Sequence, residues 1–169
     1  MHNNIPDLVV ALAGALRARG QLLATAESCT GGLIAGACTD LAGSSDWFER
    51  GFVSYSNAAK TELLGVPADL IDAHGAVSEP VALTMAAGAL RHAPAQRAVA
   101  VTGVAGPGGG TATKPVGLVW LAWAQRGVDG VIHVRAAAQQ FPGDRAAVRQ
   151  ATIVCALQGL LADLQAEAA

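Results

Sequence analysis

The chain has 169 residues, of which 52% are hydrophobic, 14% charged and 4% aromatic. Such a chain can bury one full core, and its high apolar and low charged content exclude a disordered chain. Eleven Lys and Arg against thirteen Asp and Glu give a formal net charge of −2, and without a basic run this balance argues against a nucleic-acid partner.

The first half of the chain alternates between helical and extended patterns. Apolar residues at helical spacing, with Pro6 near the start and Gly20 at the end, predict a helix over 7–19. The elements predicted after it are a strand over 21–26, a helix from about 33 to 40, a loop over 43–46, a strand over 51–55, a helix over 57–64 and a helical turn over 67–72.

The second half adds three strands and two longer helices. Ser78 is expected to cap a helix that runs to about residue 92. After it come a strand over 97–102, a glycine-rich loop over 103–114, strands over 116–124 and 131–139 joined by 125–130, and a helix that opens at 142–144 and runs to about 165. Crossovers first and a hairpin last predict an α/β layered domain with a mixed sheet, a single domain over 1–169.

Neither a membrane span nor a secretion signal is expected. The apolar stretches are too short, or too broken by Gly and polar residues, to cross a bilayer. The N-terminus lacks the basic start and apolar core of a signal peptide. Cys29, Cys38 and Cys155 form an odd number without paired spacing, which favours free thiols in a reducing compartment. We therefore expect a cytoplasmic protein with no membrane partner.

Ser28 lies between a predicted strand and a predicted helix. This placement exposes a side chain above the sheet edge, where the backbone N–H groups of Thr30, Gly31 and Gly32 could stabilise an oxyanion. Ser28 or Thr30 could instead merely cap the next helix. Cys29 is the rival nucleophile and ranks below Ser28, because no histidine partner is evident.

Tyr55 and Lys60 form a second candidate pair. A serine nucleophile needs a base, and a partly buried lysine of lowered pKa can serve, with the Tyr55 hydroxyl relaying a proton or orienting the ammonium. Alternatively, Lys60 is a solvated helix residue and Tyr55 an ordinary aromatic at a strand end. The short-chain dehydrogenase pair of Tyr and Lys has a different spacing, and the matching cofactor loop does not follow the first strand.

The glycine-rich loop and the last helix form the third candidate region. The loop begins at Thr102 and Gly103, directly after a strand, and its backbone N–H groups could hold a phosphate; it could also be a plain connector. Arg145, in the first turn of the last helix, opposes the helix dipole unless an anionic ligand or an ion pair with Asp144 compensates. Arg149 could share that face. The histidines are scattered without metal-ligand spacing, so no metal is expected.

Several sequence blocks occur in order over nearly the whole chain. They are Ala26-Glu27-Ser28-Cys29-Thr30-Gly31-Gly32, Gly43-Ser44-Ser45, Trp47-Phe48, Arg50-Gly51, Tyr55-Ser56-Asn57 with Lys60, His74-Gly75-Ala76-Val77-Ser78-Glu79, Thr102-Gly103-Val104-Ala105-Gly106-Pro107, Lys114-Pro115-Val116-Gly117 and Phe141-Pro142-Gly143-Asp144-Arg145. Together they resemble the hallmark of the CinA C-terminal domain family.

The resemblance implies both a fold and an activity. The fold would be a three-layer α/β/α domain that often self-associates, so a homo-oligomer is expected. The activity would be hydrolysis of nicotinamide mononucleotide to nicotinate mononucleotide and ammonia, without cofactor or metal. The Ser–Tyr–Lys set of the family falls on Ser28, Tyr55 and Lys60, and its substrate contacts fall on Thr102 and Arg145.

Two other functions remain open from the sequence. The chain could be a nucleotide-binding or competence-related regulatory module without catalysis, which would bind the nucleotide but release no ammonia. It could also hydrolyse a different amide, such as another pyridine nucleotide. Comparing turnover on a panel of amides separates all three.

Overall fold

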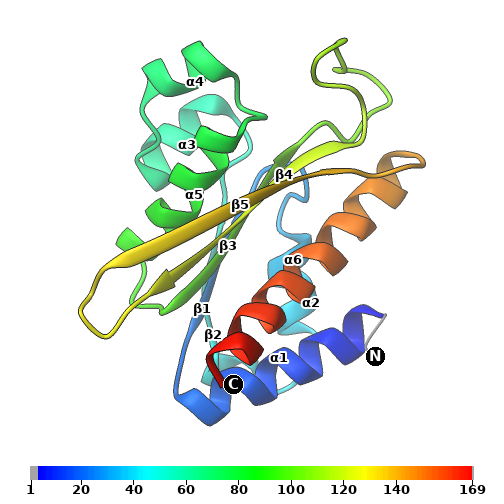
Figure 1. Cartoon of the computed structure of the whole chain (residues 1–169). Coiled ribbons are helices and arrows are strands. Elements are labelled where there is room, and N and C mark those ends of the chain that lie inside the picture. Colours follow the sequence, from blue (N-terminus) through cyan, green and yellow to red (C-terminus); the bar gives the residue numbers. More distant parts are fainter. Residues whose placement is uncertain (1–3, 169) are drawn as a thin grey trace.

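Five strands form a mixed sheet at the centre of the computed structural model, which describes residues 4–168 (Figure 1). The strands are β1 (Leu23–Glu27), β2 (Phe48–Val53), β3 (Arg97–Gly103), β4 (Leu118–Arg126) and β5 (Ile132–Gln140). Their order is β2-β1-β3-β4-β5. β1 pairs in parallel with β2 and β3, and β4 is antiparallel to both β3 and β5. This topology confirms the predicted crossovers followed by a hairpin.

Helices cover both faces of the sheet, which makes the three-layer α/β/α arrangement of Figure 1. The helices are α1 (Ile5–Arg19), α2 (Leu33–Thr39), α3 (Asn57–Leu64), α4 (Ala68–His74), α5 (Glu79–Arg91) and α6 (Arg145–Ala168). The first, second and last lie on one face, whereas α3, α4 and α5 lie on the other. The expected fold class is therefore confirmed.

The two faces carry different side chains. The face toward α5 is lined by alanines of β1, β3 and β4, which let the helix approach the sheet closely. The face toward α1 and α6 carries larger residues, among them Val99, Leu121 and Trp123. Because side chains alternate along a strand, Ala26 on the α5 face directs Ser28 to that same face, while Glu27 between them faces α2.

Close helix packing on the α5 face depends on a glycine. A Cβ at Gly88 of α5 would lie 2.1 Å from the main-chain oxygen of Leu64, the last residue of α3. The missing side chain therefore lets α3 pack directly against α5. This contact fixes α3, and with it Lys60, over the end of β1.

Three local predictions need correction. β2 begins at Phe48 rather than at residue 51, because it is an edge strand whose exposed residues lack clean alternation. β1 begins at Leu23 rather than at residue 21. Ser78 does occupy the N-cap position of α5, but its side chain caps no helix amide; it donates a hydrogen bond to the Gly75 carbonyl at 2.8 Å.

The expectation that no segment could span a membrane does not hold for α6. With 24 residues it is long and apolar enough, by length and composition, to cross a membrane. Its apolar stripe, however, is in the core: Leu157, Leu160 and Leu164 are buried against the sheet and α1. Core packing in a folded domain accounts for this hydropathy.

Candidate active site

The chain turns sharply after β1 and presents Ser28. The Gly31 N–H donates to the Ser28 carbonyl oxygen at 3.0 Å and closes the turn. Gly31 and Gly32 have φ of +58° and +101°, a backbone region that favours glycine, and α2 starts directly afterwards. The Ser28 side chain lines a cavity of about 200 Å³. The turn thus places one hydroxyl at the carboxyl end of β1.

The Glu27 side chain fixes this turn through hydrogen bonds, a role that was not predicted from the sequence. Its carboxylate is buried and accepts hydrogen bonds from the Thr30 hydroxyl at 2.7 Å and from the Ile34 and Ala35 amides of α2 at 2.8 and 2.9 Å. It thereby satisfies helix-terminal amides that would otherwise lack partners. An acid at the end of the predicted strand, a few residues before the predicted helix, was the available signal.

Replacing Glu27 by Gln should lower the free energy of unfolding by about 1–3 kcal/mol, because a side-chain NH₂ would then face the amide donors of α2. Urea denaturation measures the difference. Glu62→Gln, at an exposed position of α3, is the matched control and should change stability by less than about 0.5 kcal/mol. Equal stabilities of the two variants would contradict the role given to Glu27.

Lys60 of α3 lies directly over Ser28. Its side chain is 1% exposed, and its Nζ is 3.1 Å from Ser28 Oγ and donates to the Tyr55 carbonyl at 3.0 Å. Within residues 4–168, no carboxylate forms an ion pair with it. Burial lowers the pKa of Lys60, so the neutral amine becomes more accessible. The neutral amine donates one N–H to the Tyr55 carbonyl and keeps its lone pair free to accept the Ser28 proton.

Tyr55 reaches the site in an unexpected way. Its side chain is 59% exposed, and its hydroxyl lies 3.5 Å from Nη2 of Arg145 rather than at the Lys60 amine. Only its main-chain carbonyl contacts Lys60. The structure thus brings Tyr55 and Lys60 together through the backbone, and places the phenol beside the guanidinium.

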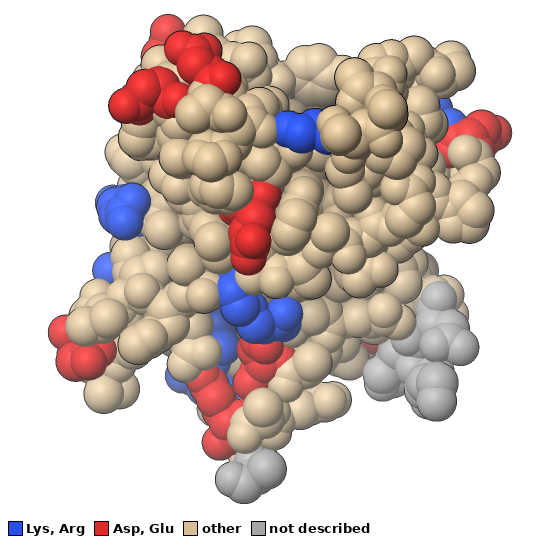
Figure 2. Space-filling model, turned by 45° about the horizontal axis from the view of Figure 1, so that its top comes forward, with Lys and Arg blue, Asp and Glu red and all other residues tan. Residues whose placement is uncertain are grey.

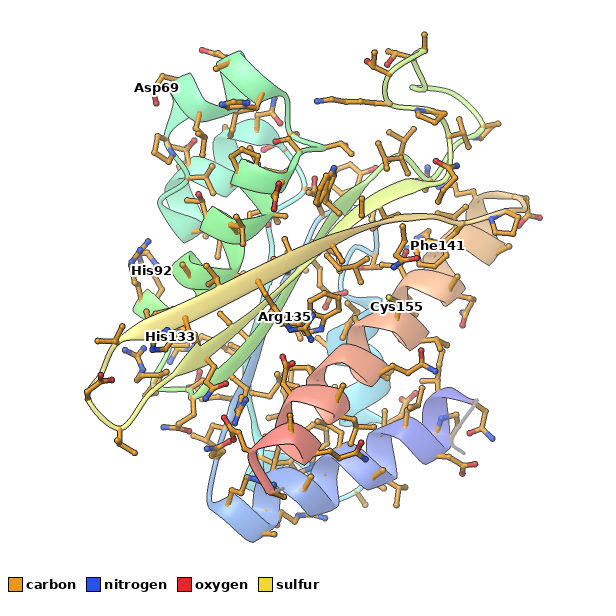
Figure 3. The ribbon with its side chains drawn as sticks, viewed as in Figure 1. Asp69, His92, His133, Arg135, Phe141 and Cys155 are labelled. Atoms are coloured by element: carbon orange, nitrogen blue, oxygen red, sulfur yellow. The ribbon has the colours of Figure 1, made fainter. Side chains whose placement is uncertain are left out.

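The two candidate arginines of α6 occupy different positions. Arg145 lines the Ser28 cavity and donates to the Gly106 carbonyl at 2.9 Å. The alternative ion pair with Asp144 is not formed, because that carboxylate accepts from the Ala147 amide at 2.9 Å. Arg149, one turn later, donates instead to the carbonyls of the Ser28 turn. Figure 3 marks Phe141, where β5 leads into this helix.

The remaining predicted contacts also line the Ser28 cavity. Thr102 and Gly103 end β3 at its wall, and the Thr102 hydroxyl donates to the Ala76 carbonyl at 2.9 Å. A second cavity of about 630 Å³ adjoins it and shares Ala105 and Arg145 with it. The Arg145 side chain thus borders both cavities, and Arg149 also lines the second.

The amide donors of the turn differ in part from the expected set. The Gly31 N–H is engaged with the Ser28 carbonyl, whereas the Cys29, Thr30 and Gly32 amides form no hydrogen bond to another described residue. Cys29 lines the Ser28 cavity, but Thr30 is fully buried and does not line it. The Thr30 hydroxyl is held by Glu27. Burial raises the pKa of the Cys29 thiol to about 11, so it stays protonated near neutral pH and is a poor rival to Ser28.

In residues 4–168 there is no group of three His, Cys, Asp or Glu side chains that could hold a metal ion. Figure 3 shows His92 at the end of α5 and His133 on β5, two separate elements. The functional candidates are therefore the serine, the lysine and the arginine around the cavity.

The fold and the site define a three-layer α/β/α protein that pairs a serine with a buried lysine at the carboxyl end of a parallel strand. Such a pair is typical of nucleophilic chemistry. The model of the CinA C-terminal domain matches residues 6–164. The chain belongs to the CinA C-terminal domain family.

Curated relatives cover almost the same length. The chain is 56% identical over 155 residues to the protein of Enterobacter agglomerans named "Nicotinamide-nucleotide amidohydrolase PncC", with 92% of each chain covered. It is 53% identical over 146 residues to the protein of the same name from Escherichia coli K12, with 86% of each covered. A "CinA-like protein" of Akkermansia muciniphila is 55% identical, but only 32% of its length is matched.

Solved structures agree with the fold. The "competence/damage inducible protein CihA" of Agrobacterium tumefaciens superposes with a TM-score of 0.88 at 46% identity, covering 98% of this chain and 99% of that one. A CinA superfamily protein of Klebsiella pneumoniae 700603 gives a TM-score of 0.90 at 38% identity, covering 96% and 99%.

Proposed function

We propose that this chain hydrolyses the carboxamide of nicotinamide mononucleotide to nicotinate mononucleotide and ammonia. The observation that carries the proposal is the 3.1 Å contact between Ser28 Oγ and the buried Lys60 amine, inside a cavity. Relatives more than half identical over most of their length bear the name of this amidohydrolase, which supports the choice of substrate.

The chemistry follows the geometry of a serine with a lysine base. Lys60 takes the Ser28 proton as Oγ attacks the carboxamide carbon, and the amides of the turn stabilise the oxyanion. The resulting ammonium of Lys60 then gives its proton to the leaving nitrogen, and ammonia departs. Water attacks the acyl-serine with Lys60 again as base, which releases the carboxylate and restores Ser28.

The two cavities suggest how the nucleotide is held. The pyridine ring would fill the space beside Ser28, with Thr102 and Gly103 in its wall. The phosphate would lie against Arg145, where the second cavity opens. Arg145 lies at the start of α6 and has no carboxylate partner among the described residues. Its guanidinium is therefore free to bind an anion.

Arg145→Met should raise the KM for nicotinamide mononucleotide by about 10–100-fold, the cost of one lost charge-assisted contact. The kcat should change far less, because the guanidinium bonds to the Gly106 carbonyl and lies beside the Tyr55 hydroxyl rather than at Ser28 or Lys60. Steady-state kinetics measures both values. Nicotinamide riboside, which lacks the phosphate, serves as the control substrate. An equal loss on riboside and mononucleotide would exclude phosphate binding by Arg145.

Ammonia release from nicotinamide mononucleotide tests the function itself. Release by the wild-type protein, with nicotinate mononucleotide formed in equal amount, supports the proposal. Binding of the nucleotide without any release would favour a non-catalytic regulatory module. Release from other amides alone would point to a different substrate.

We further propose a single domain over residues 1–169 that works in the cytoplasm as a homo-oligomer without cofactor. The free thiols at Cys29, Cys38 and Cys155 suit a reducing compartment. β5 is an edge strand with many exposed residues, a surface on which a second copy can pair. On the face in Figure 2, acidic and basic side chains are interspersed. Light scattering coupled to size-exclusion chromatography measures the oligomeric state.

A further inference from the structure

Arg149 makes two hydrogen bonds to the backbone of the Ser28 turn. Its Nε donates to the Cys29 carbonyl at 3.1 Å, and its Nη2 donates to the Thr30 carbonyl at 3.2 Å. One side chain from α6 therefore grips two successive peptide units that lie about 120 positions earlier in the chain. These contacts use the main chain of the turn and not its side chains.

Because the peptide bond is planar, these two contacts fix the orientation of both peptide units. In a trans peptide, the C=O and N–H groups point in opposite directions. Because the Cys29 carbonyl faces Arg149, the Thr30 N–H of the same peptide unit faces away from it. The next peptide gives an independent check: its carbonyl also binds Arg149, and its Gly31 N–H points back to the Ser28 carbonyl.

The Cys29 amide is left as an unused donor beside Ser28. Its N–H belongs to the same peptide unit as the Ser28 carbonyl, which faces the Gly31 N–H, so the Cys29 N–H points away from Gly31. Cys29 is buried and lines the Ser28 cavity, and its N–H forms no hydrogen bond to another described residue. A buried donor without an acceptor is costly and uncommon outside functional sites. The hydroxyl of the next residue, Thr30, is held by Glu27, so Thr30 is fixed by its side chain and by its carbonyl.

We propose that Arg149 is a positioning residue, which holds the peptide planes of the Ser28 turn so that the Cys29 amide faces the oxyanion formed at Ser28. The inference rests on the proposed function and names a residue that works through the backbone. Arg145 lines the Ser28 cavity and Arg149 does not, although both line the second cavity. In the proposal, Arg149 acts on the turn, to which it is hydrogen-bonded, and Arg145 acts on the substrate.

Kinetics of Arg149→Met, with Arg145→Met as the matched variant one turn away, test this division. Arg149→Met should lower kcat by about 10–100-fold with little change in KM, since a small misplacement of an oxyanion donor affects the transition state. The dependence of kcat on pH should keep its wild-type shape, because Lys60 is untouched. A wild-type kcat in Arg149→Met, or a loss confined to KM, would overturn the proposal.

A second readout does not depend on the substrate. A small fluorophosphonate should label Ser28 of the wild type, and its phosphoryl oxygen takes the place of the oxyanion. The labelling rate, followed by intact mass, should fall by about the same 10–100-fold in Arg149→Met and remain near wild type in Arg91→Met, at an exposed position in the last turn of α5. This comparison stays decisive for Arg149 even where wild-type protein releases no ammonia from the mononucleotide, an outcome that counts against the substrate alone.

Arg149→Lys separates positioning from folding. A lysine can donate to one of the two carbonyls and should recover part of the labelling rate, whereas the two variants should share a similar melting temperature. Labelling at the wild-type rate in both variants, or losses that track unfolding in circular dichroism, would contradict the positioning role.

Discussion

Replacing Ser28 by Ala should abolish ammonia release, with a fall in kcat of about five to six orders of magnitude, as expected for removal of a nucleophile. The fold should survive. The hydroxyl makes a single side-chain contact in the described structure, with the Lys60 amine, and the turn is held by backbone bonds and by Glu27. The melting temperature should therefore stay close to that of the wild type.

The matched control for this variant is Ser54→Ala. Ser54 follows β2, the strand beside β1, and its hydroxyl is buried without a hydrogen-bond partner in the described chain. Removing it should leave turnover at the wild-type level. Full activity in Ser28→Ala would remove this residue from the mechanism, and an equal loss in both serine variants would indicate a general packing effect.

Lys60→Met should lower kcat by about three to four orders of magnitude, because the general base is lost while the nucleophile remains. Unlike most core substitutions, it should also stabilise the fold. Lys60 is buried without a carboxylate partner in the described residues, and its lowered pKa records the cost of placing an ammonium there. Methionine has a similar length and carries no charge.

The lowered pKa of Lys60 determines whether the stability of the fold rises or falls with pH. Between the folded and the unfolded pKa of Lys60, the unfolded chain binds more protons, so the stability of the wild type rises with pH in that window. The penalty is complete below the folded pKa and disappears near the ordinary pKa of lysine. The advantage of Lys60→Met should therefore be largest at low pH and shrink as the pH rises.

Activity should follow the same group in the wild type. The value of kcat/KM should increase with pH through the lowered pKa of Lys60, since the proposed base is the neutral amine. Lys60→Arg is the matched control: it keeps the charge but cannot deprotonate in this range, so it should be inactive at every pH tested. Wild-type activity in either variant would exclude Lys60 as the base.

The position of the site follows from the strand order. Ser28, Tyr55 and Thr102 come from β1, β2 and β3, or from the residues directly after them, and these three strands are parallel neighbours. Their carboxyl ends therefore meet at one edge of the sheet. The chain leaves β1 toward β2 and leaves the neighbouring β3 toward β4, so the direction of the connections changes between β1 and β3, a usual place for a ligand in α/β proteins.

Much of this could be predicted from local pattern. Apolar periodicity and turn residues predicted the helix over 57–64 and the strand starting at 97, because amphipathic spacing and glycine punctuation act over short distances. The nucleophile turn was predictable for the same reason: a small polar residue followed by two glycines, between a strand and a helix. The boundaries of β2 were not, since an edge strand is defined by the main chain of its partner.

The sequence by itself thus determined the order of elements, the fold class and the three regions that carry Ser28, Lys60 and Arg145. Only the tertiary structure decided how they act. It brought the Tyr55 hydroxyl next to Arg145, and it let the Glu27 carboxylate accept from the first amides of α2. It also hydrogen-bonded Arg149 to the carbonyls of the turn. These contacts join residues on different elements, and their geometry depends on how α3 and α6 pack against the sheet, which spacing along the chain does not record.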